Sequence, residues 1–402
     1  MSTPPPRVVV VGAGIIGAAV AKHLAERGVR VIVLEAAPGH AQGATAASWA
    51  WLNANYKEPK HYFDLSVESM RLWRECGDVA TFTGCLFLHD ERPDLAEPGY
   101  PQRAVQGAEL LELEPGLCPA LAARCTHARL YPSEGWTDPV EATDWFLARA
   151  RAQGAEVLYG QQVEGVARGP DGRARGVVVA APAGGGAPAA ARVHEAGAVV
   201  IAAGGGSAAL AASLGHELPL LHKPAVVLLT APLPPGLVRR MVITSGAEQT
   251  GSVFILQRHD GRVVIGETSP SEAATTDTSP AAAERLLRAA AAAVPALGAA
   301  TAEGMQLGFR PFPADGYPVL GWLPSCPNAY LAVTHSGLTL APLVGALVAE
   351  EVAVAGGPPS AATLERLAPY RPDRAFPAAG AALPDAVGTA WADALTGGTR
   401  AK

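Results

Sequence analysis

The sequence predicts an α/β protein in which a parallel sheet flanked by helices is interrupted by an antiparallel sheet. Strands and helices alternate near the start, the middle and the end of the chain, as is typical of a parallel sheet. Between these parts, over 218–268, apolar runs joined by short turns indicate antiparallel strands. The parallel sheet is therefore expected to be built from separate segments of the chain.

The first of these segments has the pattern strand, helix, strand. Val8 to Val11 are four consecutive valines, which suit a strand buried on both faces. A helix is expected over 15–27, ending at Gly28, and a second apolar run follows it. This unit is typical of the start of a Rossmann-like fold.

Three glycines, Gly12, Gly14 and Gly17, stand at G-x-G-x-x-G spacing between the first strand and the helix. The first permits a tight turn, the second lets a pyrophosphate approach the backbone, and the third lets the helix pack closely. Glu35 ends the second strand, where its carboxylate can accept hydrogen bonds from an adenosine ribose and would repel a 2′-phosphate. The segment therefore predicts an adenine dinucleotide site.

The other elements are predicted from hydrophobic period and turn residues. Helices are expected at 60–76, 104–113, 138–152, 208–214, 280–294 and 337–354. Strands are expected at 81–89, 155–159, 198–202, 225–230, 253–258, 262–267 and 330–333. The stretches 36–55 and 305–322 are expected to be irregular, and Pro342 to be tolerated in the first turn of the last helix. In the helix 60–76, helical spacing predicts four core-facing residues, Phe63, Val67, Met70 and Trp73.

The order of these elements divides the chain into two discontinuous domains and a tail. The nucleotide-binding domain is expected to comprise 1–80, 132–215 and 301–376, and the substrate domain 81–131 and 216–300. Residues 377–402 are rich in Ala, Gly and Pro and are expected to be disordered.

Composition argues against several classes of protein. With 402 residues, 49% of them hydrophobic, the chain can bury two cores. A net charge of −6 argues against nucleic-acid binding. The most apolar run, 8–21, contains the three glycines and is too short for a transmembrane segment. Five cysteines without a C-x-x-C pair indicate free thiols in a reducing, cytoplasmic compartment and no zinc site.

Seven segments, in order along the chain, carry a family resemblance. They are VVVVGAGIIGAAVAKHLAERGVRVIVLE, GATAAS, EGWTDP, AVVIAAGGGS, GRVVIGET, GFRPFPADGYPVLG and YLAVTHSGLTLAPLVG. Together they resemble the D-amino-acid oxidase-like family of flavoproteins, especially its glycine oxidase, sarcosine oxidase and bacterial D-amino-acid dehydrogenase branch. The likeness extends over nearly the whole chain to about Phe376. It implies an FAD-dependent oxidoreductase with a Rossmann-like FAD-binding domain and an inserted antiparallel-sheet (α+β) substrate domain.

The resemblance also implies which residues contact FAD. Some sarcosine oxidase relatives tether the flavin through a cysteine near the GFRPFP segment, but none lies within 302–315, so FAD is expected to be non-covalent. The terminal motif of the family often carries a second glycine where Leu338 and Thr339 stand here, which could narrow the site. The following residues are implied to contact, in chain order, the pyrophosphate, the ribose, the ribityl chain and flavin, the adenine side, the dinucleotide border and the flavin ring. They are Gly12, Gly14, Ile15, Ile16, Gly17, Glu35, Ala36, Gly43, Ala44, Thr45, Ala47, Ser48, Val163, Ala203, Gly204, Gly337, Leu338, Thr339 and Leu340.

Arg310 is the strongest candidate for substrate binding. Pro311 disfavours a helical conformation at Arg310 and holds its backbone extended. A guanidinium matches a carboxylate bidentately and stays charged. In the resembling enzymes an Arg-Pro pair at this place clamps the substrate carboxylate; the alternative is a surface ion pair between domains.

Three further residues are candidates for the reaction site. His335 precedes the last helix and could add a hydrogen-bond donor or a positive charge, or could be a structural histidine packed at the strand end. Trp49 and Trp51 follow the loop of small residues and would give a dry site that favours a neutral amine. Each tryptophan could equally be a core residue.

The leading functional hypothesis is an FAD-dependent enzyme that removes hydride from a C–N bond of a small amino acid or secondary amine carrying a carboxylate. The product is an imine, and oxygen or an electron carrier takes up the electrons. One alternative is oxidation of a 2-hydroxy acid, since Arg310 selects the carboxylate and not the amine. Others are a redox-silent FAD-binding module and, less favoured, a nicotinamide dehydrogenase.

Overall fold

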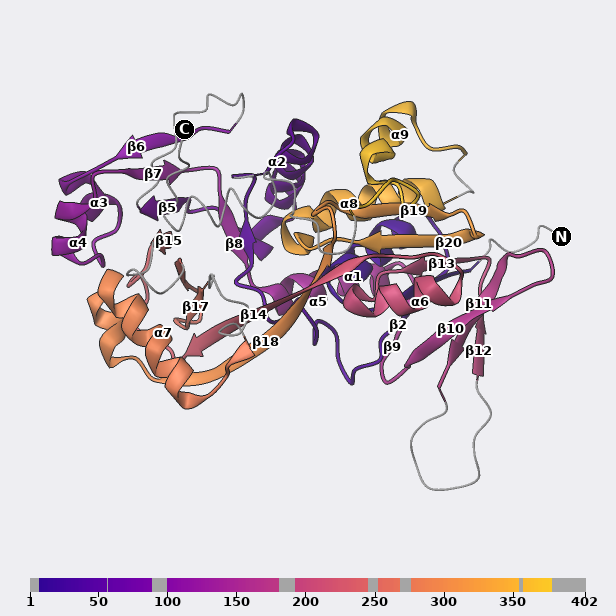
Figure 1. Cartoon of the computed structure of the whole chain (residues 1–402), viewed down its shortest axis with the longest axis horizontal. Coiled ribbons are helices and arrows are strands. Elements are labelled where there is room, and N and C mark those ends of the chain that lie inside the picture. The colour runs from indigo at the N-terminus through magenta and orange to yellow at the C-terminus, as the bar shows by residue number, and fades with distance from the viewer. Residues whose placement is uncertain are drawn as a thin grey trace, which may run out of the picture.

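The computed structural model describes residues 7–55, 57–88, 100–180, 192–244, 252–267, 276–353 and 357–377. These residues form a six-stranded sheet, an eight-stranded sheet and two three-stranded sheets. Figure 1 shows the six-stranded sheet with its helices in one half of the molecule and the eight-stranded sheet in the other. All but the first residue of the expected tail lie outside the described residues.

The six-stranded sheet has the order β19-β20-β13-β1-β2-β9. Its central strand β1 pairs in parallel with β2 on one side and β13 on the other, with Val8 aligned to Val31 and to Ala198. Only the edge strand β19 is antiparallel to its neighbour. The sheet therefore joins the start, middle and end of the chain; its strands are β1 (Val8–Val11), β2 (Val31–Leu34), β9 (Glu156–Leu158), β13 (Ala198–Ile201), β19 (Val319–Leu323) and β20 (Cys326–Val333).

This sheet is the middle of three layers. Val8 and Val10 pack in one core cluster with residues of α1, α5 and α8, whereas Val9 and Val11 pack in another with β10, β11 and α6. Alternate side chains of β1 thus reach opposite layers, which is why all four valines are buried. The covering elements are α1 (Ile15–Glu26), α5 (Pro139–Ala152), α6 (Ser207–Ser213), α8 (Gly337–Val352), β10 (Val163–Arg168), β11 (Ala174–Val179) and β12 (Arg192–Glu195).

The eight-stranded sheet has the order β18-β14-β17-β16-β15-β5-β7-β6 and is antiparallel except for the pair β15 and β5. Figure 1 shows β14 and β18 running from this sheet towards the six-stranded one. Its strands are β5 (Cys85–Leu88), β6 (Arg103–Val105), β7 (Ala128–Tyr131), β14 (Leu220–Thr230), β15 (Met241–Thr244), β16 (Val253–Gln257), β17 (Val263–Glu267) and β18 (Ala302–Pro313).

Smaller elements complete the described chain. A short sheet of order β3-β8-β4 lies beside α2, whose buried residues include Tyr62, Met70 and Trp73. Phe63 and Val67, predicted to face the core, are only half-buried. The elements are β3 (Trp51–Leu52), β4 (Ala80–Thr81), β8 (Gly135–Thr137), α2 (Lys60–Glu75), α3 (Ala108–Leu113), α4 (Pro119–Arg124), α7 (Pro280–Ala293), α9 (Ala361–Leu367), and the 3-10 turns η1 (Gly77–Val79), η2 (Gly204–Gly206), η4 (Pro295–Ala299) and η6 (Ala368–Tyr370).

Four local predictions were wrong. The helix expected over 104–113 is shorter, because Arg103–Val105 form β6 and α3 begins at Ala108. The stretch 305–322 is not irregular, because β18 pairs with β14 along its length and β19 follows it. Trp51 and Leu52 form a short strand inside the expected loop 36–55. Pro342 is the sixth residue of α8, beyond its first turn.

The expected division into two domains stays a prediction, with one difference at residue 301. The strand that begins just after this boundary, β18, was assigned to the nucleotide-binding part, yet it belongs to the eight-stranded sheet. Its pairing with β14 decides this membership, since the backbone hydrogen bonds of β18 are made there.

The described part of the chain has its cysteines unpaired, and it shows neither a cluster of metal ligands nor a helix that spans a membrane. The five cysteines are free thiols, and the cytoplasmic location expected from them stays a prediction. Within the described ranges, no cluster of His, Cys, Asp or Glu could hold a metal ion. Among the helices of the described residues, none is long and apolar enough to cross a bilayer.

Candidate active site

A cavity of about 1330 Å³ lies where the carboxyl ends of β1, β2 and β13 meet β14, β18 and the start of α8. Crevices outside the carboxyl ends of parallel strands are where α/β sheets bind ligands. The volume exceeds the usual range for a drug-sized ligand and suits a dinucleotide together with a small substrate. Apart from Gly17 and Leu340, every predicted site residue lines this cavity.

The glycine turn has no room for side chains. Gly12 has a φ of +103°, and a Cβ there would lie 2.6 Å from the carbonyl oxygen of Ala202. A Cβ at Gly17 would lie 2.0 Å from the carbonyl oxygen of Gly12, so this glycine serves helix packing and does not line the cavity. The backbone of the turn can therefore approach a ligand closely.

Helix α1 begins at this turn with its N-terminus towards the cavity. Gly14 is its N-cap, and the hydroxyl of Thr45 accepts a hydrogen bond from the N–H of Ile15 at 3.2 Å. Helix N-termini attract anions through free N–H groups and the helix dipole. The arrangement suits the pyrophosphate of a dinucleotide.

Glu35 stands just after β2, and its carboxylate is held by backbone N–H groups. It accepts from Ala13 at 2.7 Å and from Ala37 at 2.9 Å. Each carboxylate oxygen can accept more than one hydrogen bond, so the group can also receive a ribose hydroxyl from the cavity. The ribose contact stays a prediction; the contact with the glycine turn is an additional role that the motif did not reveal.

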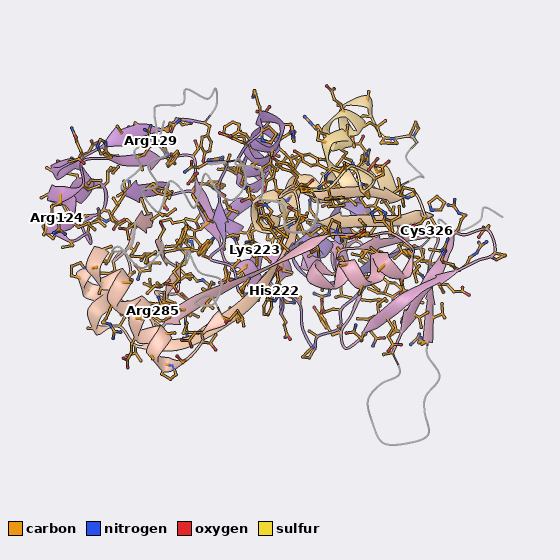
Figure 2. All side chains as sticks on the ribbon, viewed as in Figure 1. Arg124, Arg129, His222, Lys223, Arg285 and Cys326 are labelled. Carbon is orange, nitrogen blue, oxygen red and sulfur yellow. The ribbon has the colours of Figure 1, made fainter. Side chains whose placement is uncertain are left out.

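Arg310 lies on β18, aligned with Lys223 of β14. Figure 2 shows Lys223 and its neighbour His222 near the middle of the molecule. The Nε of Arg310 is buried and has no hydrogen-bond partner within the described residues, and its guanidinium lies 5.9 Å from the centre of the Phe312 ring. Burial lowers the pKa of Arg310 from its ordinary value. A buried donor without a partner needs an acceptor, and the cavity is where a ligand carboxylate would supply one.

His335 is half-buried and is hydrogen-bonded on both ring nitrogens. Its Nε2 lies 2.9 Å from the carbonyl oxygen of Gly316, which can only accept, so this nitrogen carries the proton. Its Nδ1 lies 3.3 Å from the hydroxyl of Ser336, which itself accepts from Tyr62 at 2.8 Å. Burial, with the charges of Arg310 and Lys57, lowers its pKa to about 3.

This pKa bears on the two interpretations of His335. The ring is neutral at physiological pH, so it does not supply the positive charge that the sequence allowed. Its only N–H is occupied by Gly316, and its face stacks on Phe312 with ring centres 4.2 Å apart. The structure therefore favours the packed, structural histidine at the wall of the cavity.

Trp49 and Trp51 both line the cavity and are both fixed by packing. The Trp49 ring stacks on Phe254 at 3.7 Å, and it fills the space where a Cβ at Gly266 would lie. The Nε1 of Trp51 donates to Glu134 at 2.7 Å. Each tryptophan therefore belongs both to the cavity wall and to the packed core. Each ring packs against the region of the eight-stranded sheet and presents one surface to the cavity.

Three residues at the same end of the cavity were missed. Tyr62 lines it from α2, and Lys57 lines it from the preceding loop with an Nζ that is buried and has no hydrogen-bond partner in the described structure. Glu134 lies behind Trp51, bonded also to the hydroxyl of Tyr100, and burial raises its pKa to about 8. The glutamate belongs to the EGWTDP segment, but nothing in the sequence marks Lys57, since a loop lysine is normally solvated.

Leu338 and Thr339, which stand where the resemblance implied a glycine, attach the start of α8 to neighbouring elements. The hydroxyl of Thr339 donates to the carbonyl oxygen of Trp51 at 3.1 Å and accepts from the N–H of Asn53 at 3.4 Å. The carbonyl of Leu338 accepts from Trp73 at 2.8 Å. Both residues line the cavity, so the loop 49–53 and the helix start form one wall.

The family model described as "DAO: FAD dependent oxidoreductase" matches residues 7–351. No curated protein sequence matches the chain significantly.

Solved structures are similar over most of the chain. Glycine oxidase from Geobacillus kaustophilus is 25% identical with a TM-score of 0.74, over 93% of this chain and 100% of that one. L-proline dehydrogenase from P. horikoshii is 23% identical with a TM-score of 0.72, over 88% and 95%. L-amino acid deaminase from Proteus vulgaris, with its specific insertion sequence deleted, is 20% identical with a TM-score of 0.74, over 93% and 95%.

Proposed function

Since the chain belongs to the DAO family of FAD-dependent oxidoreductases, we propose that it oxidises a C–N bond of a small amino acid or secondary amine that carries a carboxylate. The product is an imine, which water hydrolyses. Oxygen or an electron carrier is proposed as the final acceptor. The similar structures named as glycine oxidase, L-proline dehydrogenase and L-amino acid deaminase support an amino-acid substrate.

The observation that carries this proposal is Arg310. Its buried Nε has no partner within the described residues, and it opens on the same cavity as the glycine turn and the start of α8. A guanidinium in this setting binds a carboxylate by paired, charge-assisted hydrogen bonds. The substrate would therefore be oriented by its carboxylate beside the cofactor.

The residues present fit FAD as the cofactor. The turn at Gly12, the N-terminus of α1 and the carboxylate of Glu35 suit the adenosine diphosphate half, and the first turn of α8 suits the flavin half. When bound, FAD supplies the hydride acceptor. Among the described residues that line the cavity none is a cysteine, which supports non-covalent binding.

The other residues orient the substrate and exclude water. Trp49 and Trp51 form an apolar wall, and a dry site favours the neutral amine over the ammonium form. His335 is neutral, so it adds no second charge beside Arg310, and its ring holds Phe312 in place by stacking. The positive dipole end of α8 favours negative charge in the part of the cavity that it borders.

Anaerobic bleaching of the purified holoprotein tests the proposal. A panel of D- and L-amino acids, glycine, sarcosine and proline is compared with the matching 2-hydroxy acids while the flavin absorbance is recorded. Bleaching by amines and not by hydroxy acids is expected. Bleaching by hydroxy acids alone would establish the alternative reaction, and a flavin that no member of the panel reduces would contradict an oxidoreductase of small carboxylates.

A further inference from the structure

Lys57 has a buried ammonium for which the described residues offer no hydrogen-bond partner. The residue is 9% exposed, its Nζ is unpartnered, and it lies on the wall of the active-site cavity. The ammonium lies 5.4 Å from the centre of the Tyr62 ring, which is its contact on the protein side. A buried cation is costly, so burial lowers the pKa of Lys57 to about 7 even though the charge of Glu134 acts to raise it. An anionic ligand group beside Nζ would restore the charge of Lys57, and this arrangement therefore indicates a missing ligand group.

Arg310 is a second group of the same kind, with a buried Nε that has no hydrogen-bond partner among the described residues. It lines the cavity from β18, whereas Lys57 lines it from the loop before α2. Both residues act on the half-buried His335, whose pKa is lowered by each of their charges. Arg310 approaches it through Phe312, which stacks on the face of the imidazole at 4.2 Å. Lys57 approaches it through Tyr62, whose hydroxyl lies 3.4 Å from Nε2 at the edge of that ring. The two cations are therefore linked to His335 through different aromatic rings, Phe312 for Arg310 and Tyr62 for Lys57.

Four glutamates lie in or around the cavity, and none of them makes a hydrogen bond to Nζ of Lys57 or Nε of Arg310. Glu164 lies exposed on β10, and the other three are bonded to other groups. Glu267 forms a two-pronged ion pair with Arg285, with distances of 2.5 and 2.6 Å. Glu134 is bonded to the indole of Trp51 and the hydroxyl of Tyr100. Glu35 is bonded to the glycine turn at the opposite end, next to the N-terminus of α1. Of the cationic side chains that line the cavity in the described structure, Lys57 and Arg310 thus have buried nitrogens without a hydrogen-bond partner, and these are left to the ligand.

We propose that Lys57 binds a second anionic group of the substrate, so that the preferred substrate is an amino acid or secondary amine with two carboxylates, one held by Arg310 and the other by Lys57. This assignment rests on the proposed function, because it uses Arg310 as the first carboxylate site. The proposal predicts that the enzyme selects substrates by charge and not by size. The reason is that the Lys57 ammonium binds a carboxylate more strongly than it binds an amide of the same shape.

The experiment compares isosteric pairs on the holoprotein. Anaerobic flavin reduction is measured with aspartate against asparagine, glutamate against glutamine, in both enantiomers, and iminodiacetate against its monoamide. We expect the wild type to prefer the dicarboxylate member by at least about tenfold in the ratio of reduction rate to dissociation constant, the effect of one charge-assisted hydrogen bond. In K57M this ratio should fall to about one. Lys223 also lines the cavity, and K223M should keep the preference.

A second measurement decides the proposal even where no amine reduces the flavin. Non-oxidisable succinate and glutarate are titrated against propionate and butyrate, following the perturbation of the flavin spectrum. Tighter binding of the dicarboxylates that is lost in K57M supports the assignment, whatever the reaction. Equal binding of both classes by the wild type would overturn it, as would a preference that K57M keeps or that K223M alone removes. Unfolding midpoints in urea verify that K57M and K223M are folded.

Discussion

The indole N–H of Trp73 donates a hydrogen bond of 2.8 Å to the carbonyl oxygen of Leu338, and a proline explains why that oxygen is free. In a regular helix this carbonyl would accept from the N–H of residue 342. Pro342 has no N–H, and α8 nevertheless continues through it to Val352. Trp73 on α2 therefore replaces a backbone donor, and it does so at the turn of α8 that lines the cavity.

We expect W73F to lower the free energy of unfolding by about 1–3 kcal/mol, because the Leu338 carbonyl would be buried without a donor. FAD affinity should fall as well, since the same turn borders the cavity. Urea unfolding and flavin titration of the apoprotein measure both effects. The control is W145F, a half-buried tryptophan whose ring contacts Arg149 on α5. Equal losses in the two variants would contradict a specific role of the Trp73 donor.

R310A should retain FAD and weaken use of carboxylate substrates by about 2–4 kcal/mol, as expected when a charged partner is stranded. The ratio of reduction rate to dissociation constant, from anaerobic stopped-flow mixing, measures this loss. R310K should recover part of it, because an ammonium keeps the charge and lacks the planar fork. R262A, which removes an arginine paired with Glu303 and Asp260, is the control. Unchanged kinetics in R310A would remove Arg310 from the site.

E35Q should weaken FAD binding, because an amide NH₂ would face the N–H of either Ala13 or Ala37 where a carboxylate oxygen now accepts. One buried hydrogen bond lost in this way costs about 1–3 kcal/mol. Fluorescence titration of the apoprotein with FAD measures the dissociation constant. E156Q changes an exposed glutamate on the neighbouring strand β9 and should bind as the wild type does. An unaltered affinity in E35Q would contradict the role of Glu35 in shaping the turn.

His335 should lower the stability of the apoprotein as pH drops below about 6.5, whereas Glu134, whose pKa is raised to about 8 by burial, should act in the opposite sense. The pKa of His335 is lowered to about 3 in the folded chain, so below its ordinary value of 6.5 the unfolded chain binds a proton that the folded chain does not. The contribution is complete above pH 6.5 and is lost progressively towards pH 3. Between pH 7.5 and 5.5 this histidine should account for a loss of about 1.4 kcal/mol.

The variant H335Q isolates the contribution of His335 to the pH dependence of the unfolding free energy. It removes the titrating ring, and the glutamine amide can still donate to the Gly316 carbonyl. Urea unfolding at the two pH values should show a smaller loss in H335Q than in the wild type. H127Q, at an exposed histidine, should show the full wild-type loss. If H335Q and the wild type lose the same amount of stability, His335 does not remain neutral in the folded protein.

The cofactor half of the site could be predicted because its geometry is local. Gly12, Gly17 and Glu35 belong to one strand-helix-strand unit, and their spacing alone places them around one turn. Lys57 and Glu134 could not be predicted in this way. Their burial depends on the packing of α2, β8 and the strands of the eight-stranded sheet, which come from separate parts of the chain.

Arg310 could be predicted from its residue type and its following proline, but not from its strand. Pro311 and Pro313 made the segment look irregular, since neither can donate to a β ladder. The segment nevertheless forms β18, because β18 is the edge strand of its sheet and pairs on one side only, with β14. Prolines are tolerated on edge strands for this reason.

Because of the order β20-β13-β1, the six-stranded sheet can be completed only late in the synthesis of the chain. β1 leaves the ribosome first, but its partner β13 begins at Ala198, and β13 in turn pairs with β20, whose aligned residue is Ala329. The sheet therefore cannot be completed until β20 has been synthesised. Pairings between residues so far apart in the chain also make folding slow. The cofactor is thus received by a nearly finished polypeptide and cannot guide the early stages of its folding.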